Sequence, residues 1–199
     1  FFHEPYASSA SEMVAELVQY LSEHPKVTVP EAESMLAGIM LDTKNFTIRT
    51  GVRTFEAAAY LRKMGADTVE VRKLFASSME TYQQKARLVA AAEVYRGCAI
   101  AYTENPGEDI RIVAAQAADE LLNINGVNAS FVLYEIGGGV SISARSMGAV
   151  NVQIIMEALG GGGHLTMAAV QMKDIVMENA RQKLLAAIDQ YFQDSGQNQ

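Results

Sequence analysis

Gly160-Gly161-Gly162-Gly163-His164 places four glycines in a row directly before a histidine. Glycine in regular structure costs roughly 0.5–1 kcal/mol relative to alanine, because it loses more backbone entropy on folding. Such a run is therefore expected where the backbone approaches a neighbour closely or adopts positive φ. The functional interpretation is a phosphate or nucleotide cradle, with Gly161, Gly162, Gly163 and His164 as binding positions. The alternative is a flexible turn followed by a surface histidine.

Polar residues precede the glycine run and form a second candidate group. Ser143 and Arg145 lie in a predicted strand whose alternate residues are apolar. The guanidinium of Arg145 can present two parallel donors to a phosphate. Asn151 opens the short predicted helix that leads into the glycines, where it either caps that helix or contacts a ligand.

Asp42 is a third candidate, at the C-terminal end of a predicted helix. The helix dipole disfavours a carboxylate there by roughly 0.3–1 kcal/mol. A metal ion such as Mn²⁺ or Mg²⁺ would offset that cost, since Asp is a suitable oxygen ligand. A solvated aspartate that begins a turn explains the same position.

Composition limits the classes of function. Of the 199 residues, 49% are hydrophobic and 20% charged, which is typical of a globular protein. The net charge of −7 argues against non-specific binding of long nucleic acids. The single cysteine, Cys98, excludes an intramolecular disulfide, and we expect it to be a buried strand thiol. No stretch approaches the ~18 apolar residues that span a bilayer, so a soluble, cytoplasmic domain is expected.

The patterning predicts an α/β fold with a helical first half. A capping box is expected at residues 9–12, residues 28–31 indicate a second helix start, and Thr54 is expected to cap a third helix. Residues 68–95 lack Gly and Pro, which predicts one long linker helix. The second half alternates between strands and helices and predicts a mixed sheet. The predicted strands are Cys98–Thr103, Ala129–Ile136 and Val140–Ser146, and the predicted helices are Ile110–Leu122, Val152–Leu159 and Ile175–Phe192.

These residues carry a resemblance. Ser143-Ala144-Arg145-Ser146, Asn151-Val152 and the glycine run with His164, followed by Ala168-Ala169, resemble the DHH-associated domain of DHH phosphoesterases. Gly38-Ile39-Met40-Leu41-Asp42-Thr43, followed by Phe46, resembles the catalytic DHH domain. Together they are most similar to the GdpP (YybT) branch, which consists of membrane-anchored enzymes that hydrolyse cyclic di-AMP to pApA.

The resemblance implies a division into residues 1–84, the C-terminal part of a DHH domain, and residues 85–199, the associated domain. It also implies a centre of two Mn²⁺ ions, to which Asp42 supplies a ligand. Arg145, Ser143, Asn151 and the glycines would hold the substrate, and His164 would stabilise developing charge. No Asp-His-His motif occurs in this sequence. We therefore expect an incomplete metal site, an inactive chain, exposed apolar surface on the first half, and a homodimer as one way to cover it.

Three functions remain open from the sequence. The parent protein is expected to be a Mn²⁺-dependent cyclic di-AMP phosphodiesterase. An enzyme of the same superfamily that degrades short oligonucleotides is the first alternative. A nucleotide-binding module without catalysis is the second, and it is the expectation for this chain alone.

Overall fold

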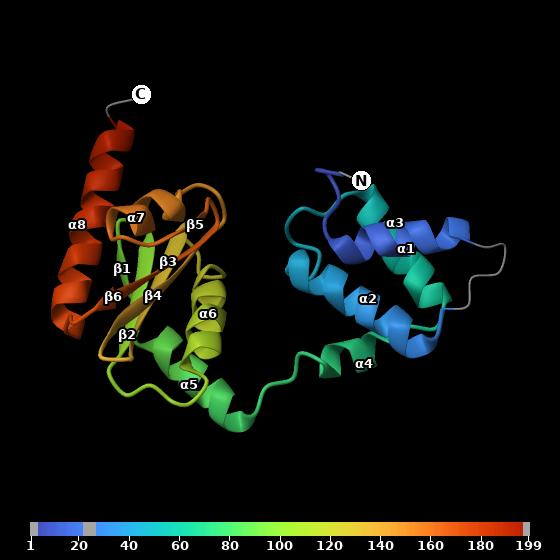
Figure 1. Ribbon diagram of the computed structural model, residues 1–199, viewed down its shortest axis with the longest axis horizontal. Coiled ribbons are helices and arrows are strands. Elements are labelled where there is room, and N and C mark those ends of the chain that lie inside the picture. The colour runs from blue at the N-terminus through green and yellow to red at the C-terminus, as the bar shows by residue number, and fades with distance from the viewer. Residues whose placement is uncertain (1–3, 22–26, 197–199) are drawn as a thin grey trace. The chain divides into compact units, whose positions relative to one another are not determined.

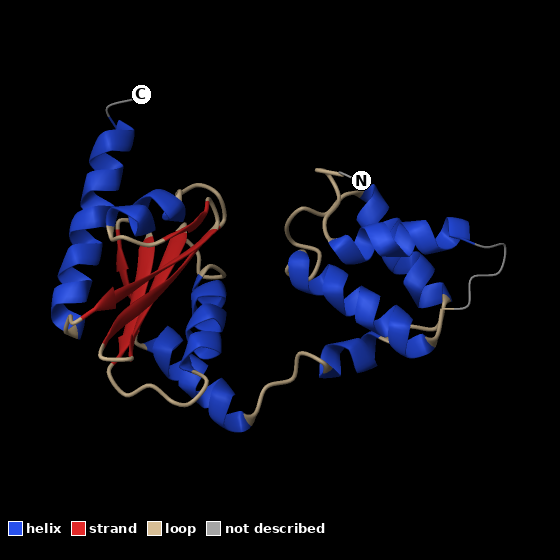
Figure 2. Cartoon of the chain, in the orientation of Figure 1, coloured by secondary structure: helices blue, strands red, loops and turns tan. Residues whose placement is uncertain are grey.

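The computed structural model describes residues 4–21 and 27–196, which fall into two compact units, Phe1–Ala76 and Ser77–Gln199 (Figure 1). Unit 1 is helical, whereas unit 2 combines helices with a sheet (Figure 2). The α/β class with a mixed sheet is therefore confirmed. The boundary expected after residue 84 falls inside a helix of unit 2. No helix within the described ranges combines the length and apolar character needed to cross a membrane.

Unit 1 is held together by small and aliphatic side chains that its helices bury against one another. Its described helices are α1 (Ala10–Leu21), α2 (Val29–Asp42), α3 (Val52–Lys63) and α4 (Thr68–Lys73). Ala15 of α1, Ile39 of α2 and Leu61 of α3 meet in this core and are fully buried. Large apolar side chains also lie on the surface, among them Tyr20 (86% exposed) and Leu21 (78% exposed), as expected for this half.

The helix starts of unit 1 follow the predicted capping chemistry with two differences. The Glu31 carboxylate accepts hydrogen bonds from the backbone N–H and hydroxyl of Thr28, both at 2.8 Å, and α2 begins at Val29, which confirms the helix start expected at residues 28–31. In the capping box expected at residues 9–12, the Glu12 carboxylate accepts hydrogen bonds from Ser8 and not from Ser9. The prediction that Thr54 is an N-cap was wrong. Gly51 is the N-cap, and its N–H donates to Oγ1 of Thr54 at 3.1 Å.

The single linker helix predicted over residues 68–95 is replaced by three elements. These are α4, then α5 (Met79–Ala90), then the strand β1 (Glu93–Tyr95). The Ser78 hydroxyl accepts the N–H of Thr81 at 3.1 Å and so starts a new helix. Val94 and Tyr95 are β-formers that gain a strand partner in unit 2. Helix propensity alone did not reveal these tertiary and capping signals.

Unit 2 is built on a six-stranded sheet in the order β1-β2-β3-β4-β6-β5. Strands β2 and β3 are parallel and are joined by a helical crossover, and the other neighbours are antiparallel. The remaining elements of unit 2 are β2 (Cys98–Thr103), α6 (Ile110–Leu121), β3 (Ala129–Ile136), β4 (Gly139–Ser146), α7 (Val152–Ala158), β5 (Gly162–His164), β6 (Met167–Lys173) and α8 (Met177–Gly196). The strand and helix predictions listed for this half are confirmed, while β5 and β6 were not predicted.

Helices cover the two faces of the sheet unequally. Side chains of α7 and α8 pack on one face and enclose a core that includes Phe131 and Ile142. Side chains of α5 and α6 pack on the opposite face over Val132 and Tyr134. Figure 1 shows α8 and α6 on opposite sides of the sheet. Exposed and buried residues alternate along β6. The residues of β6 that point to the α6 side of the sheet are the exposed ones.

Cys98, the first residue of β2, is fully buried. Desolvation raises the pKa of this thiol to about 11, since burial disfavours the thiolate. The nucleophilic form is therefore scarce at pH 8 in the folded protein. We expect the native chain to resist an aromatic disulfide reagent at pH 8 and to react fully in denaturant. Rapid labelling of the native chain would contradict the burial of this residue.

Candidate functional site

The strand register brings four of the candidate residues of unit 2 into two rows across β4, β6 and β5. In the Arg145 row, Arg145 lies opposite Met167, and Met167 lies opposite His164. In the Ser143 row, Ser143 lies opposite Ala169, and Ala169 lies opposite Gly162. Residues directly opposite in antiparallel strands project on the same face, with Cβ atoms about 4.5–5.5 Å apart.

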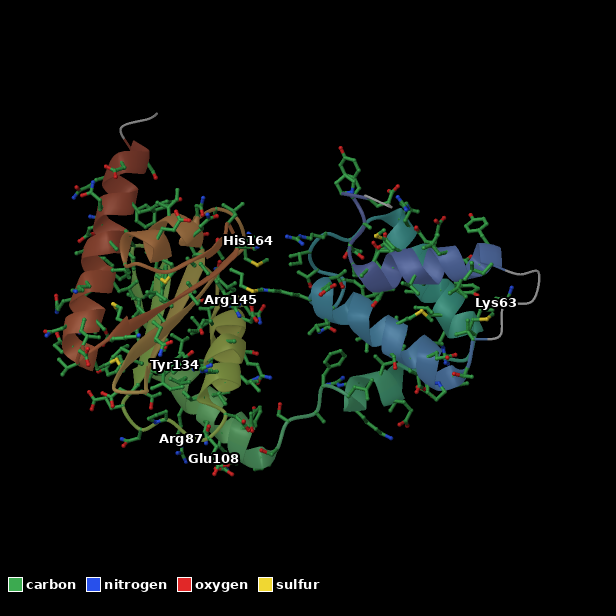
Figure 3. All side chains as sticks on the ribbon, viewed as in Figure 1. Lys63, Arg87, Glu108, Tyr134, Arg145 and His164 are labelled. Carbon is green, nitrogen blue, oxygen red and sulfur yellow. The ribbon has the colours of Figure 1, made fainter. Side chains whose placement is uncertain are left out.

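Both rows lie on the face of the sheet that carries α6. Ala144 and Ala168, which alternate with them, are buried in the core under α7 and α8. Arg145 instead reaches Asp119, a residue of α6. The face beyond α6 is open at β6, where Met167 is 51% exposed. In Figure 3, Arg145 and His164 lie at the same side of unit 2.

The Arg145 side chain is held in place but leaves donors free. Only 11% of the side chain is exposed, and its Nε lies 3.5 Å from Oδ1 of Asp119. Nη1 donates to the carbonyl oxygen of Ala144 at 3.0 Å. The buried Nε makes no hydrogen bond, and no partner of Nη2 occurs within residues 4–21 and 27–196. A guanidinium anchored in this way can offer charge-assisted donors to an anion.

The glycine run is partly a strand, which corrects the prediction of a loop. Gly162–His164 is the edge strand β5, paired with β6. A Cβ on Gly161 would lie 2.3 Å from the carbonyl oxygen of Ala169, and one on Gly163 would lie 2.4 Å from Cα of Ala168. Gly163 also has φ +152°, a region open almost solely to glycine. These two glycines are thus required by packing against β6.

Gly162 differs from its neighbours because nothing lies within 4 Å of a Cβ built on it, and its φ is not positive. Neither packing nor backbone strain within the described chain explains the glycine at this position. Its place in the Ser143 row means that half-buried bare backbone lies beside Ala169. Because β5 is the edge of the sheet, one set of its backbone groups also lacks a strand partner.

His164 ends β5 as an exposed side chain without a described partner in the part of the chain that the structure covers. The turn that follows His164 forms backbone hydrogen bonds with β4 and α7. The N–H of Ser146 donates to the carbonyl oxygen of Thr166 at 3.0 Å, and that of Val152 donates to Leu165 at 3.2 Å. These bonds keep the end of β4, the start of α7 and His164 together.

Asn151 occupies the N-cap of α7. Its side-chain oxygen accepts the N–H of Gln153 at 3.1 Å, and its own N–H donates to the Tyr191 hydroxyl at 2.9 Å. The capping interpretation of this residue is therefore confirmed. Its amide nitrogen carries no described hydrogen bond and remains available next to the Leu165 turn.

Asp42 lies in unit 1 as the exposed last residue of α2. The next segment is strained, since Lys44, Asn45 and Phe46 have φ of 46°, 55° and 62°. Within residues 4–21 and 27–196, no group of three or more His, Cys, Asp or Glu side chains is arranged to hold a metal ion. One exposed carboxylate does not fit a two-metal centre, so this chain's described residues do not make that site.

Sequence reasoning missed Asp119 and the strand β6. Asp119 follows a run of alanines on α6, so its only signal was a charge beside small residues. Residues Met167–Lys173 do alternate, but their small and flexible side chains made the pattern weak. Both features matter because β6 links Arg145 with His164, and Asp119 holds the arginine.

Comparison with known proteins identifies the domain that carries these residues. Residues 99–194 match the DHHA1 domain family. The chain is 51% identical over 194 residues to the cyclic-di-AMP phosphodiesterase GdpP of Geobacillus thermodenitrificans, which covers 96% of this chain and 30% of that protein. It is 49% identical over 191 residues to the cyclic-di-AMP phosphodiesterase PdeA of Listeria monocytogenes, covering 95% of this chain and 29% of that protein. The chain thus spans less than a third of these relatives.

A solved structure supports the fold. An exopolyphosphatase-related protein from Bacteroides fragilis matches with a TM-score of 0.85 at 23% identity, covering 96% of this chain and 58% of that one. At this identity the likeness concerns the fold alone. The half-identical relatives and the matched domain together give the assignment: residues 99–194 match the DHHA1 domain family, and nearly the whole chain is similar to part of two cyclic-di-AMP phosphodiesterases.

Proposed function

We propose that this chain is part of a cyclic di-AMP phosphodiesterase and that unit 2 holds the nucleotide substrate. The observation that carries the proposal is the shared face of Arg145, His164 and Gly162 on β4, β6 and β5. A cation, an imidazole and bare backbone on one face that is open at β6 suit a phosphate group. The cyclic-di-AMP phosphodiesterases that match at about half identity support the same substrate.

Each residue of the site has a distinct proposed role. The free donors of Arg145 bind phosphate oxygens, while Asp119 keeps the guanidinium oriented. His164 lies two strand spacings from Arg145, roughly 10 Å between backbones, so both side chains can contact one phosphate. His164 then stabilises negative charge that develops on the phosphate. Gly162 allows the close approach of the nucleotide, and Ser143 lies two strands away in the same row.

Hydrolysis is proposed for the whole protein, with Mn²⁺ as its metal and pApA as its product. Asp42 would supply one ligand, and the others would have to come from outside the described residues. When bound, such ions activate water and neutralise the scissile phosphate. For the chain itself we propose binding without turnover, in which Arg145, Gly162 and His164 hold the nucleotide.

Calorimetric titration of the 199-residue chain with cyclic di-AMP tests this proposal. We expect binding without Mn²⁺, a similar affinity with it, and no pApA after incubation, since the cradle consists of protein groups alone. The control is adenosine, which lacks phosphate and should not bind. Absence of binding by the folded chain would contradict the proposal, as would conversion to pApA. A short RNA that displaced cyclic di-AMP with higher affinity would instead identify an oligonucleotide-degrading enzyme.

A further inference from the structure

Gln171 continues the site along the same face of β6. It lies opposite Ser141 of β4, two residues beyond the Ser143 row, and we name this pair the Gln171 row. Alternate residues of a strand share a face, so Gln171 projects on the side that carries Arg145, Ala169 and Gly162. The three rows are spaced by about 6.6 Å along the strands.

The side chain of Gln171 is free to bind a ligand. It is exposed, and no hydrogen bond of its amide is described in residues 4–21 and 27–196. Its Nε2 lies 3.9 Å from the position that a Cβ on Gly137 would occupy, so the β3–β4 turn beside it offers no covering side chain. Between Gln171 and the Arg145 row lie Ala169 and Gly162, which leave room above the sheet.

The order of the rows matches the order of groups in a nucleotide. A phosphate at the Arg145 row would place the ribose over Ala169 and Gly162 and the base near Gln171. A glutamine amide can accept from the N6 amino group of adenine and donate to N7. Guanine has an acceptor, O6, where adenine has its amino group, so the amide oxygen would face a second acceptor.

We propose that Gln171 is a specificity-determining residue that hydrogen-bonds the adenine edge of the nucleotide and disfavours guanine. This inference rests on the proposed nucleotide function of unit 2. In this proposal β6 contacts the base, whereas β4 and β5 contact the phosphate.

The test compares affinities of the 199-residue chain for cyclic di-AMP and cyclic di-GMP. For Gln171→Leu we expect affinity for cyclic di-AMP to fall about tenfold and affinity for cyclic di-GMP not to fall, because the adenine contact is lost and the unfavourable contact with guanine O6 is removed. Gln171→Glu keeps the size but replaces the donor to N7 with an acceptor, and it should weaken cyclic di-AMP binding similarly. The matched control is Gln182→Leu. Gln182 is an exposed residue of α8, and its Nε2 donates a hydrogen bond to Glu178 at 2.8 Å.

The outcomes separate this inference from the proposed function. If the wild-type chain binds cyclic di-AMP and the Gln171 variants keep its preference over cyclic di-GMP within about twofold, the role of Gln171 is wrong while the nucleotide site stands. If the wild-type chain binds neither dinucleotide, both proposals are wrong. An equal loss of both dinucleotides in folded variants would also overturn base reading, since it would indicate a phosphate contact.

Discussion

Arg145→Ala should weaken binding of cyclic di-AMP by the chain by about 10- to 100-fold. A hydrogen bond to a charged group contributes about 1.5–3 kcal/mol, and Nη2 of Arg145 has no partner among the described residues. Arg145→Lys should be intermediate, because an ammonium keeps the charge but loses the planar fork. Calorimetric titration at two salt concentrations measures the loss, and the wild-type affinity should fall with salt more steeply than that of the alanine variant.

The matched control for this experiment is Arg181→Ala. Arg181 is also partly buried in unit 2, with 27% of its side chain exposed, but its Nη2 bonds Glu93 at 2.7 Å and it lies outside the proposed site. Its removal should leave dinucleotide affinity unchanged. Unaltered affinity in a folded Arg145→Ala variant would remove Arg145 from the site. Thermal unfolding of each variant checks that the fold is retained.

Substitutions within the glycine run should affect either the free energy of unfolding or the affinity for cyclic di-AMP, depending on the position. Gly163→Ala is expected to destabilise unit 2 by about 2–4 kcal/mol, since a Cβ would clash with backbone atoms of β6 at a φ that alanine avoids. Gly161→Ala should act in the same direction through its contact with the Ala169 carbonyl oxygen. The measurement is urea unfolding followed by circular dichroism, with the midpoint shifted to lower urea and an unchanged slope.

Gly162→Ala provides the matched comparison within the same run. No atom lies within 4 Å of its Cβ, so the free energy of unfolding should change by less than about 0.5 kcal/mol. The added methyl group would nevertheless lie on the proposed site face and should reduce cyclic di-AMP affinity. Strong destabilisation by Gly162→Ala, or normal binding in spite of the methyl group, would contradict the different roles assigned to these glycines.

Local chemistry was sufficient to predict much of unit 2. The residue pattern of the second half predicted the strands β2, β3 and β4. Asn151 was correctly considered as a cap because an N-cap needs only the residues that follow it. The helix over residues 68–95 was mispredicted, because Ser78 begins a new helix and residues 93–95 gain a strand partner distant in sequence.

The sequence by itself determined which chemical groups are present: an arginine in a strand, four glycines before a histidine, and a carboxylate at a helix end. Only the tertiary structure decided which of them lie together. Pairing through β6, a strand that propensity did not reveal, puts Arg145, Gly162 and His164 on one face, while Asp42 belongs to a separate unit. The physical reason is that side-chain direction in a sheet depends on register, and register is set by contacts between segments that are remote along the chain.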